Sequence, residues 1–111
     1  EAGVQAWNSS SWTDTNLAAQ LDNLETIADI GLVERASGSG FYAAVAYETT
    51  GSVHLVEVWE YDGTGWQQAG PDIEPGSGSE WIDITLDSSS RPVVVYVEGS
   101  SGNLYAKGFR E

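Results

Sequence analysis

The chain repeats its own pattern, and this repeat is the feature that most restricts the folds open to it. Trp12 and Leu32 lie 20 residues apart, and so do Trp66 and Leu86. The repeat length is 54 in the first copy and about 49 in the second. The aligned pairs are Asp29 with Asp83, Ile30 with Ile84, Leu32 with Leu86, Val45 with Val94, Tyr47 with Tyr96, Val58 with Ala106 and Tyr61 with Phe109. An internal repeat of this length is typical of folds in which similar units stack on one another.

Each copy contains short apolar segments that predict β-strands. They are rich in β-branched and aromatic residues, and glycine and serine clusters separate them. The expected strands are 24–32, 41–48, 53–61 and 65–73 in the first copy, and 81–87, 92–98 and 103–109 in the second. The segments 4–7 and 11–19 match the third and fourth strands of a copy. The sequence therefore predicts an all-β fold of two four-stranded antiparallel units.

Residues 15–30 also fit another interpretation. Their apolar residues are spaced as on one face of an amphipathic helix, at Leu17, Leu21, Leu24 and Ala28. The aligned segment of the second copy contains Pro71, Pro75 and a Gly/Ser cluster, which a helix interior does not tolerate. The repeat therefore favours the strand interpretation.

A motif of an aromatic residue, a four-residue turn and a tryptophan recurs along the chain. It reads "YDGTGW" from Tyr61 to Trp66 and "WNSSSW" from Trp7 to Trp12, and Phe109 begins it again in "GFRE". The first copy of the motif predicts a hairpin between the third and fourth strands. A four-stranded unit of this size matches a propeller blade, and a propeller closes its ring by combining strands from both chain ends in one blade.

The expected organisation is a single domain over residues 1–111. Its blade repeats span about 12–65 and 66–111, and residues 1–16 supply strands that complete a neighbouring blade. Two blades cannot close a ring, because they leave sheet faces and edges without partners. Either the chain is a piece of a longer propeller, or copies of it join head to tail by strand exchange. Such contacts form a closed ring or, where the rotation does not close, a filament.

The charge of the chain restricts its partners. Seventeen acidic residues against four basic ones give a formal net charge of −13, which repels phosphate backbones and anionic lipids. We therefore expect no nucleic-acid partner. We also expect no membrane insertion, because no apolar run approaches the roughly 20 residues of a membrane helix. The chain begins without methionine and contains none, which suggests a processed mature end or an excised fragment, and we favour secretion as the cause.

With Tyr-Asp-Gly-Thr-Gly-Trp at 61–66 and two blade-like repeats in a short chain, the sequence resembles the fucose-binding propeller lectins of fungi and bacteria. The resemblance covers residues 41–70 and 92–109. Some of those lectins close a ring from small two-blade subunits, so the resemblance implies a propeller that assembles from several copies. The sugar-gripping arginine and glutamate of that family are not matched. The aligned positions carry Val45 and Val94 for the arginine, and Val58 and Ala106 for the glutamate.

Candidate site residues follow from the chemistry of sugars and cations. Trp59, Tyr61 and Trp81 have flat rings that suit the C–H faces of a sugar, and the Glu60 carboxylate suits its hydroxyl groups. The alternative for these rings is packing between blades. Asp29 and Asp83 occupy equivalent places in the innermost expected strands, where repeated carboxylates around a central channel could bind Ca²⁺. The alternative for both is hydrogen bonding to neighbouring backbone.

No catalytic residue is predicted. His54 is the only histidine, and no Gly-x-Ser-x-Gly motif accompanies it. We expect a secreted, non-enzymatic, carbohydrate-binding protein that self-assembles and needs no cofactor; Ca²⁺ at Asp29 and Asp83 is the one candidate ion. The alternative is a structural subunit of an extracellular fibre or surface layer built by head-to-tail strand exchange.

Overall fold

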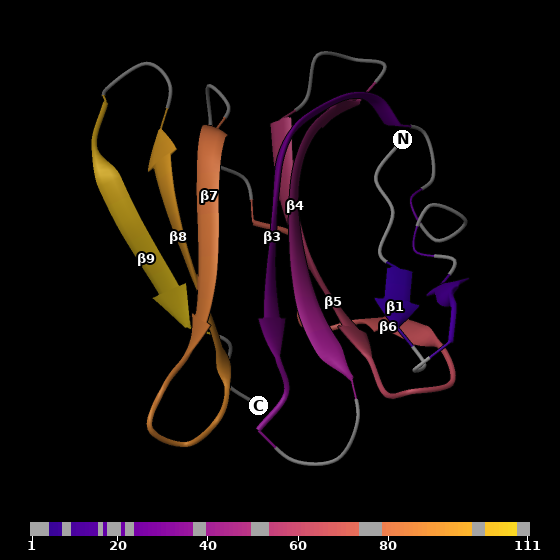
Figure 1. The fold of residues 1–111 in the computed structure, drawn as a ribbon. Coiled ribbons are helices and arrows are strands. Elements are labelled where there is room, and N and C mark those ends of the chain that lie inside the picture. Colours follow the sequence, from indigo (N-terminus) through magenta and orange to yellow (C-terminus); the bar gives the residue numbers. More distant parts are fainter. Residues whose placement is uncertain are drawn as a thin grey trace.

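The chain folds into antiparallel β-sheets (Figure 1). The computed structural model describes residues 5–7, 10–15, 17, 21, 24–36, 40–49, 54–73, 79–98 and 102–108. These residues contain no α-helix, and nothing in them is long and apolar enough to cross a membrane as a helix. The strands are β1 (Gln5–Trp7), β2 (Trp12–Asp14), β3 (Leu24–Glu34), β4 (Phe41–Thr49), β5 (His54–Tyr61), β6 (Trp66–Gln68), β7 (Ser79–Leu86), β8 (Pro92–Glu98) and β9 (Leu104–Gly108).

The strands form two larger sheets and one hairpin. The first sheet has the order β3-β4-β5-β6, the second has the order β7-β8-β9, and β1 pairs with β2. The prediction of an all-β fold is confirmed, because a strand is present in each segment expected in the two copies. The strand expected over 65–73 is shorter than predicted, since β6 ends at Gln68. The helix interpretation is wrong for residues 24–30, which belong to β3. Residues 16, 18–20, 22 and 23 of that segment lie outside the described residues.

Strand pairing in the two sheets follows the sequence repeat. Ile30 pairs with Val45 in the first sheet, and Ile84 pairs with Val94 in the second. The alignment of β9 needs a correction. Ala106 pairs with Val95, whose equivalent in the first sheet pairs with Val56, so Ala106 corresponds to Val56 and not to Val58. The shift of two residues keeps the same face of the strand. Phe109 lies outside the described residues.

The first sheet has an apolar core on each of its faces. Its junction face, which carries Ala44 and Ala46, packs against the second sheet, with Ile84 and Val94 in the shared core. Its N-terminal face, which carries Ala43, Val45 and Tyr47, packs against Leu17 and Leu21. Alternation along β4 thus buries both sides of one strand. Figure 1 shows the two sheets meeting along β3 and β7, with β1 on the side of β6.

The two complete copies of the aromatic motif form hairpins in the same register. Tyr61 pairs with Trp66 between β5 and β6, and Trp7 pairs with Trp12 between β1 and β2. The prediction that "YDGTGW" connects two antiparallel strands is therefore confirmed, and "WNSSSW" makes the equivalent connection.

Candidate functional site

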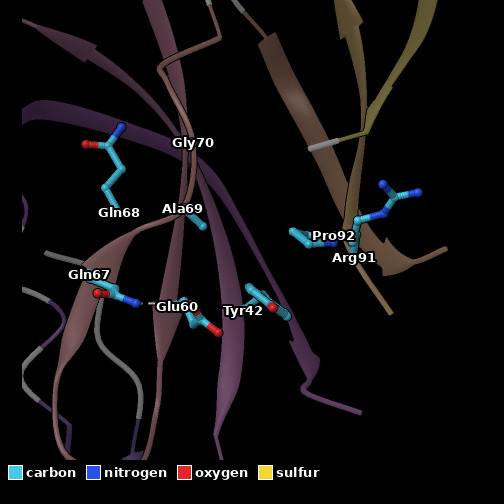
Figure 2. Close-up of a pocket in the computed structure, with 8 residues that line it drawn as sticks. All are labelled: Tyr42, Glu60, Gln67, Gln68, Ala69, Gly70, Arg91 and Pro92. Atoms are coloured by element: carbon cyan, nitrogen blue, oxygen red, sulfur yellow. Dashed lines mark hydrogen bonds between the residues drawn. The ribbon is translucent and has the colours of Figure 1, made fainter. Parts of the chain in front are cut away.

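A pocket of about 280 Å³ opens where the two sheets meet (Figure 2). The first sheet and the segment after β6 form one wall, and the start of β8 forms the other. The pocket is lined by Tyr42, Glu60, Gln67, Gln68, Ala69, Gly70, Arg91 and Pro92. Its volume lies near the lower limit for small-molecule sites, so it suits a small ligand.

Three polar side chains stand in a row across the first wall. Tyr42 on β4 pairs with Glu60 on β5, which pairs with Gln67 on β6, so all three point to the junction face. Gln67 Nε2 donates a hydrogen bond of 3.3 Å to Glu60 Oε1. Figure 2 shows these side chains on the same side of the pocket, opposite Pro92. The row presents a phenol, a carboxylate and an amide to a ligand.

The Glu60 carboxylate is held from more than one direction. Arg35 Nε lies 3.2 Å from Glu60 Oε2, and both side chains are mostly buried. Burial raises the pKa of Tyr42, and the neighbouring Glu60 carboxylate raises it further, whereas Arg35 lowers it. With its pKa raised, the Tyr42 hydroxyl stays protonated at neutral pH and can act as a donor. This wall is preorganised because its charged group already has fixed partners.

The second wall is positioned by a turn that Asp87 stabilises. Asp87 Oδ1 accepts hydrogen bonds from the backbone N–H of Ser89 at 2.8 Å and of Arg91 at 3.0 Å. Asp87 Oδ2 lies 3.1 Å from Arg91 Nε. The backbone N–H of Arg91 is the largest cause of the lowered pKa of Asp87. The turn therefore fixes Arg91 and the adjacent Pro92 at the mouth of the pocket.

The end of the pocket is formed where the chain leaves β6. Ala69 N donates to Val58 O at 2.8 Å, and Ile73 forms an isolated bridge with Val56 further along β5. The chain between these bonds bulges away from β5, and Gly70 adopts a positive φ of 81° there. The bulge leaves space beside β5 that a regular strand would fill.

Tyr61, a predicted sugar-binding residue, is engaged within its own hairpin. Its ring lies 5.1 Å from that of Trp66 and stacks on Phe41, and its hydroxyl donates to Gly63 O at 3.2 Å. The hairpin loop is stabilised by Asp62 Oδ1, which accepts from Thr64 N, Thr64 Oγ1 and Gly65 N at 2.9, 2.8 and 3.0 Å. These bonds lower the pKa of Asp62 to about 2, with the Thr64 backbone N–H as the largest cause. The ring and hydroxyl of Tyr61 thus have partners within the hairpin, and sugar binding by Tyr61 stays a prediction.

The predicted tryptophans lie apart from each other and from the pocket. Trp59 packs against the core of the N-terminal face. Its indole Nε1 is buried and has no hydrogen-bond partner within the described part of the chain. Trp81 is 66% exposed on the second sheet. Of the four residues predicted to bind sugar, only Glu60 lines the pocket.

Asp29 connects the two sheets. Its Oδ1 accepts from Ile30 N at 2.9 Å, and its Oδ2 accepts from Ile82 N on β7 at 2.9 Å. Asp83 Oδ1 accepts from Ile84 N at 2.8 Å. The described residues contain no group of three or more acidic, histidine or cysteine side chains placed to hold a metal ion. Calcium binding by these aspartates stays a prediction.

Sequence reasoning missed Tyr42, Gln67 and Arg91. Tyr42 and Gln67 lie beside Glu60 because of the strand register. The alternating pattern predicts which face of the sheet a side chain lies on, but not which residue lies opposite it on the next strand. Arg91 joins them only because the second sheet packs on the first. No family model, curated protein or solved structure matches the chain.

Proposed function

We propose that this chain is a secreted, non-enzymatic carbohydrate-binding protein and that its ligand occupies the pocket between the two sheets. The observation that carries the proposal is the row of Tyr42, Glu60 and Gln67 along one wall. A carboxylate and an amide suit the hydroxyl groups of a sugar, and an aromatic ring beside them suits its C–H face. The pocket of about 280 Å³ is suited to one or two sugar rings rather than a long chain.

The pocket favours binding over hydrolysis. Glycosidases generally place two carboxyl groups on either side of the bond that they cleave. The lining residues include one carboxylate, Glu60, which Arg35 and Gln67 hold in place. They include no serine, cysteine or histidine that would supply a nucleophile or a base.

The proposal includes an architecture and an assembly. The two sheets are consecutive blades of a propeller, and β2 of one copy adds a fourth strand beside β9 of another. The support is the shared register of the two hairpins, because β2 pairs with β1 as β6 pairs with β5. The two apolar cores support it too. Each core combines one sheet face with the segment that follows a strand in the fourth position of a copy, which is β2 in one case and β6 in the other. These segments supply Leu17 and Leu21 in one core, and Ala69 and Ile73 in the other.

A structural subunit of an extracellular fibre is the second candidate. It is favoured by apolar side chains that are exposed on different strands, at Ile30, Leu32, Trp81 and Leu104. Such residues suit contacts that continue from copy to copy without closing.

A glycan array followed by calorimetric titration of any sugar that binds tests the proposed function. Glu60→Gln and Tyr42→Phe should each weaken binding roughly tenfold or more, because a hydrogen bond to a charged or buried group is lost. Trp81→Phe is the matched control, since Trp81 lies outside the pocket, and it should bind as the parent does. Binding to no glycan would overturn the proposal. Loss of binding in Trp81→Phe alone would move the site to the exposed tryptophan.

A further inference from the structure

The junction between the two sheets has a polar link at its innermost strands. Asp29 on β3 points to the junction face, because its strand partner is Ala46. Its Oδ1 accepts from the N–H of the next residue, Ile30, and its Oδ2 crosses to Ile82 N on β7 at 2.9 Å. One carboxylate thus fixes the strand that carries it and joins it to the neighbouring sheet.

Asp83 is the equivalent of Asp29 on the second sheet. Its strand partner, Val95, is the equivalent of Ala46. Its Oδ1 accepts from the N–H of the next residue, Ile84, at 2.8 Å, which repeats the bond from Ile30 to Asp29. Asp83 is exposed and lies on the outer face of the second sheet, which is defined by Asp83, Thr85, Val93, Val95 and Ala106. By this equivalence, its Oδ2 corresponds to the Asp29 oxygen that accepts from Ile82 N of the neighbouring sheet.

The outer face of the second sheet is apolar where it would meet a neighbour. Val93 and Val95 lie on it and are half-buried, and Ala106 is exposed. Their equivalents on the first sheet, Ala44 and Ala46, are buried because the second sheet covers them. The outer face of the second sheet therefore resembles the junction face of the first sheet, which the second sheet covers.

The complementary surface lies on the opposite side of the molecule. Ile30 and Leu32 on β3 belong to the N-terminal face of the first sheet, since they pair with Val45 and Ala43. They are 38% and 48% exposed. The equivalent of Ile30 is Ile84, which is 5% exposed because it packs into the junction. Along β3, the N-terminal face of the first sheet thus resembles the face of the second sheet that carries Ile84 and packs against the first sheet.

We propose that the outer face of the second sheet binds the β3 side of the N-terminal face of a second copy, head to tail. The second carboxylate oxygen of Asp83 accepts the backbone N–H of Ile27 of that copy, since Ile27 pairs with Tyr47 as Ile82 pairs with the equivalent Tyr96. Ile30 of the second copy packs over Val93 and Val95, as Ile84 packs with Ala44 and Ala46 within one chain. The two contacting surfaces are different parts of the chain. When two copies bind, one copy therefore still exposes its outer face and the other its β3 surface, and each can bind a further copy.

The contact between copies is wider than the internal junction. A Cβ atom at Gly31 would lie 3.3 Å from Ile84 Cγ2, so a side chain there would be tight against Ile84 unless Ile84 shifts. The second sheet has Thr85 at the equivalent position, and valines in place of Ala44 and Ala46.

Complementation of two variants tests the orientation. Sedimentation velocity of the full chain should show association that increases with concentration. Val95→Glu should block the outer face, and Ile30→Glu should block the β3 surface, so each variant alone should stay monomeric. An equimolar mixture should form a dimer of twice the monomer mass, because each partner retains the surface that the other lacks. A monomeric parent chain, association of either variant at the parent's level, or a mixture that stays monomeric would each overturn the proposal.

Further variants separate a local effect from a folding defect. Ala106→Glu blocks the same face from an exposed position and replaces Val95→Glu if the latter does not fold by circular dichroism. Ser89→Glu in an exposed turn is the matched control and should associate as the parent does. Asp83→Asn keeps an acceptor for Ile84 N but loses the second one, so the dissociation constant should rise roughly tenfold. An unchanged constant would remove Asp83 from the contact.

This inference rests on the proposed relation between the sheets as blades, and not on sugar binding. The pocket lies within one copy, so glycan binding can be measured on the monomeric Ile30→Glu variant. Binding without association would overturn the contact alone, and association without binding would overturn the proposed ligand alone.

Discussion

The indole Nε1 of Trp66 donates a hydrogen bond of 2.9 Å to the carbonyl oxygen of Thr15, 51 residues earlier in the chain. Thr15 is 6% exposed and directly follows β2. The bond therefore joins the aromatic hairpin of the first sheet to the segment that brings Leu17 and Leu21 onto its N-terminal face. The tryptophan of the motif thus contributes to tertiary packing as well as to the hairpin.

Replacing Trp66 by phenylalanine should lower the free energy of unfolding by about 1–2 kcal/mol, because the Thr15 carbonyl loses its donor at a partly buried site. Urea unfolding measures the change. Trp81→Phe is the matched control at a site that is 66% exposed, and it should change the value by less than about 0.5 kcal/mol. Equal losses in the two variants would contradict a specific role for the Trp66 bond.

The Asp62 carboxylate should make stability depend on pH below about 4. Its pKa is about 2 in the folded chain against an ordinary value of 3.8. The ionised form stabilises the folded state above the ordinary value, and this contribution is lost as the pH falls from about 4 towards 2. Asp62→Asn keeps an acceptor oxygen but lacks the charge. Asparagine also stands at the equivalent position of "WNSSSW", where the residue is Asn8. The difference in urea midpoint between parent and variant should shrink over that range, and a constant difference would exclude this role of the charge.

The position and type of the strands could be predicted because alternation and turn residues are local signals. The register of β9 could not. The sequence alignment matched Val58 with Ala106, whereas strand pairing matches Val56 with Ala106. A shift of two residues leaves every side chain on the same face, so the hydrophobic pattern does not detect it. Only backbone pairing with β8 distinguishes the two registers.

Of the four residues predicted to bind sugar, the sequence placed only Glu60 among the residues that line the pocket. Glu60 was a candidate because a carboxylate beside aromatic residues suggests sugar binding. Trp59 and Tyr61 share that neighbourhood in sequence, but the strand turns Trp59 to the opposite face and Tyr61 stacks within its hairpin. Arg91 enters through contact between separate sheets, which no local pattern contains.

Gly40 should be among the least replaceable residues. A Cβ atom there would lie within 1.9 Å of Tyr61 O, and the residue has a φ of 132°. Gly40→Ala should therefore cost more than about 2 kcal/mol, because the clash involves backbone and not a movable side chain. Gly65 is the matched control, since nothing lies within 4 Å of a Cβ there, and Gly65→Ala should stay within about 0.5 kcal/mol. Similar melting temperatures for both variants would contradict the close approach.

Removal of residues 1–10 tests strand exchange. β1 and β9 both match the third strand of a copy. β1 pairs with β2 as β5, the third strand of the first sheet, pairs with β6. Without β1, the edge of β2 becomes open to β9 of another copy. We therefore expect the shortened chain to form larger assemblies than the parent in sedimentation velocity. Assemblies of the same size or smaller would contradict exchange through β2.

Asp29 and Asp83 provide a test of backbone bonding against calcium binding. Asp29→Ala removes the acceptors of Ile30 N and Ile82 N, and the second of these joins the sheets. The loss should be about 1–3 kcal/mol, because a partly buried N–H is left without its partner. Asp83→Ala removes one described bond, to Ile84 N, and should cost less. Urea unfolding in excess calcium and in excess chelator measures both. A loss in the parent chain on adding chelator, equal to that of Asp29→Ala, would instead show that a bound cation supplies the stability.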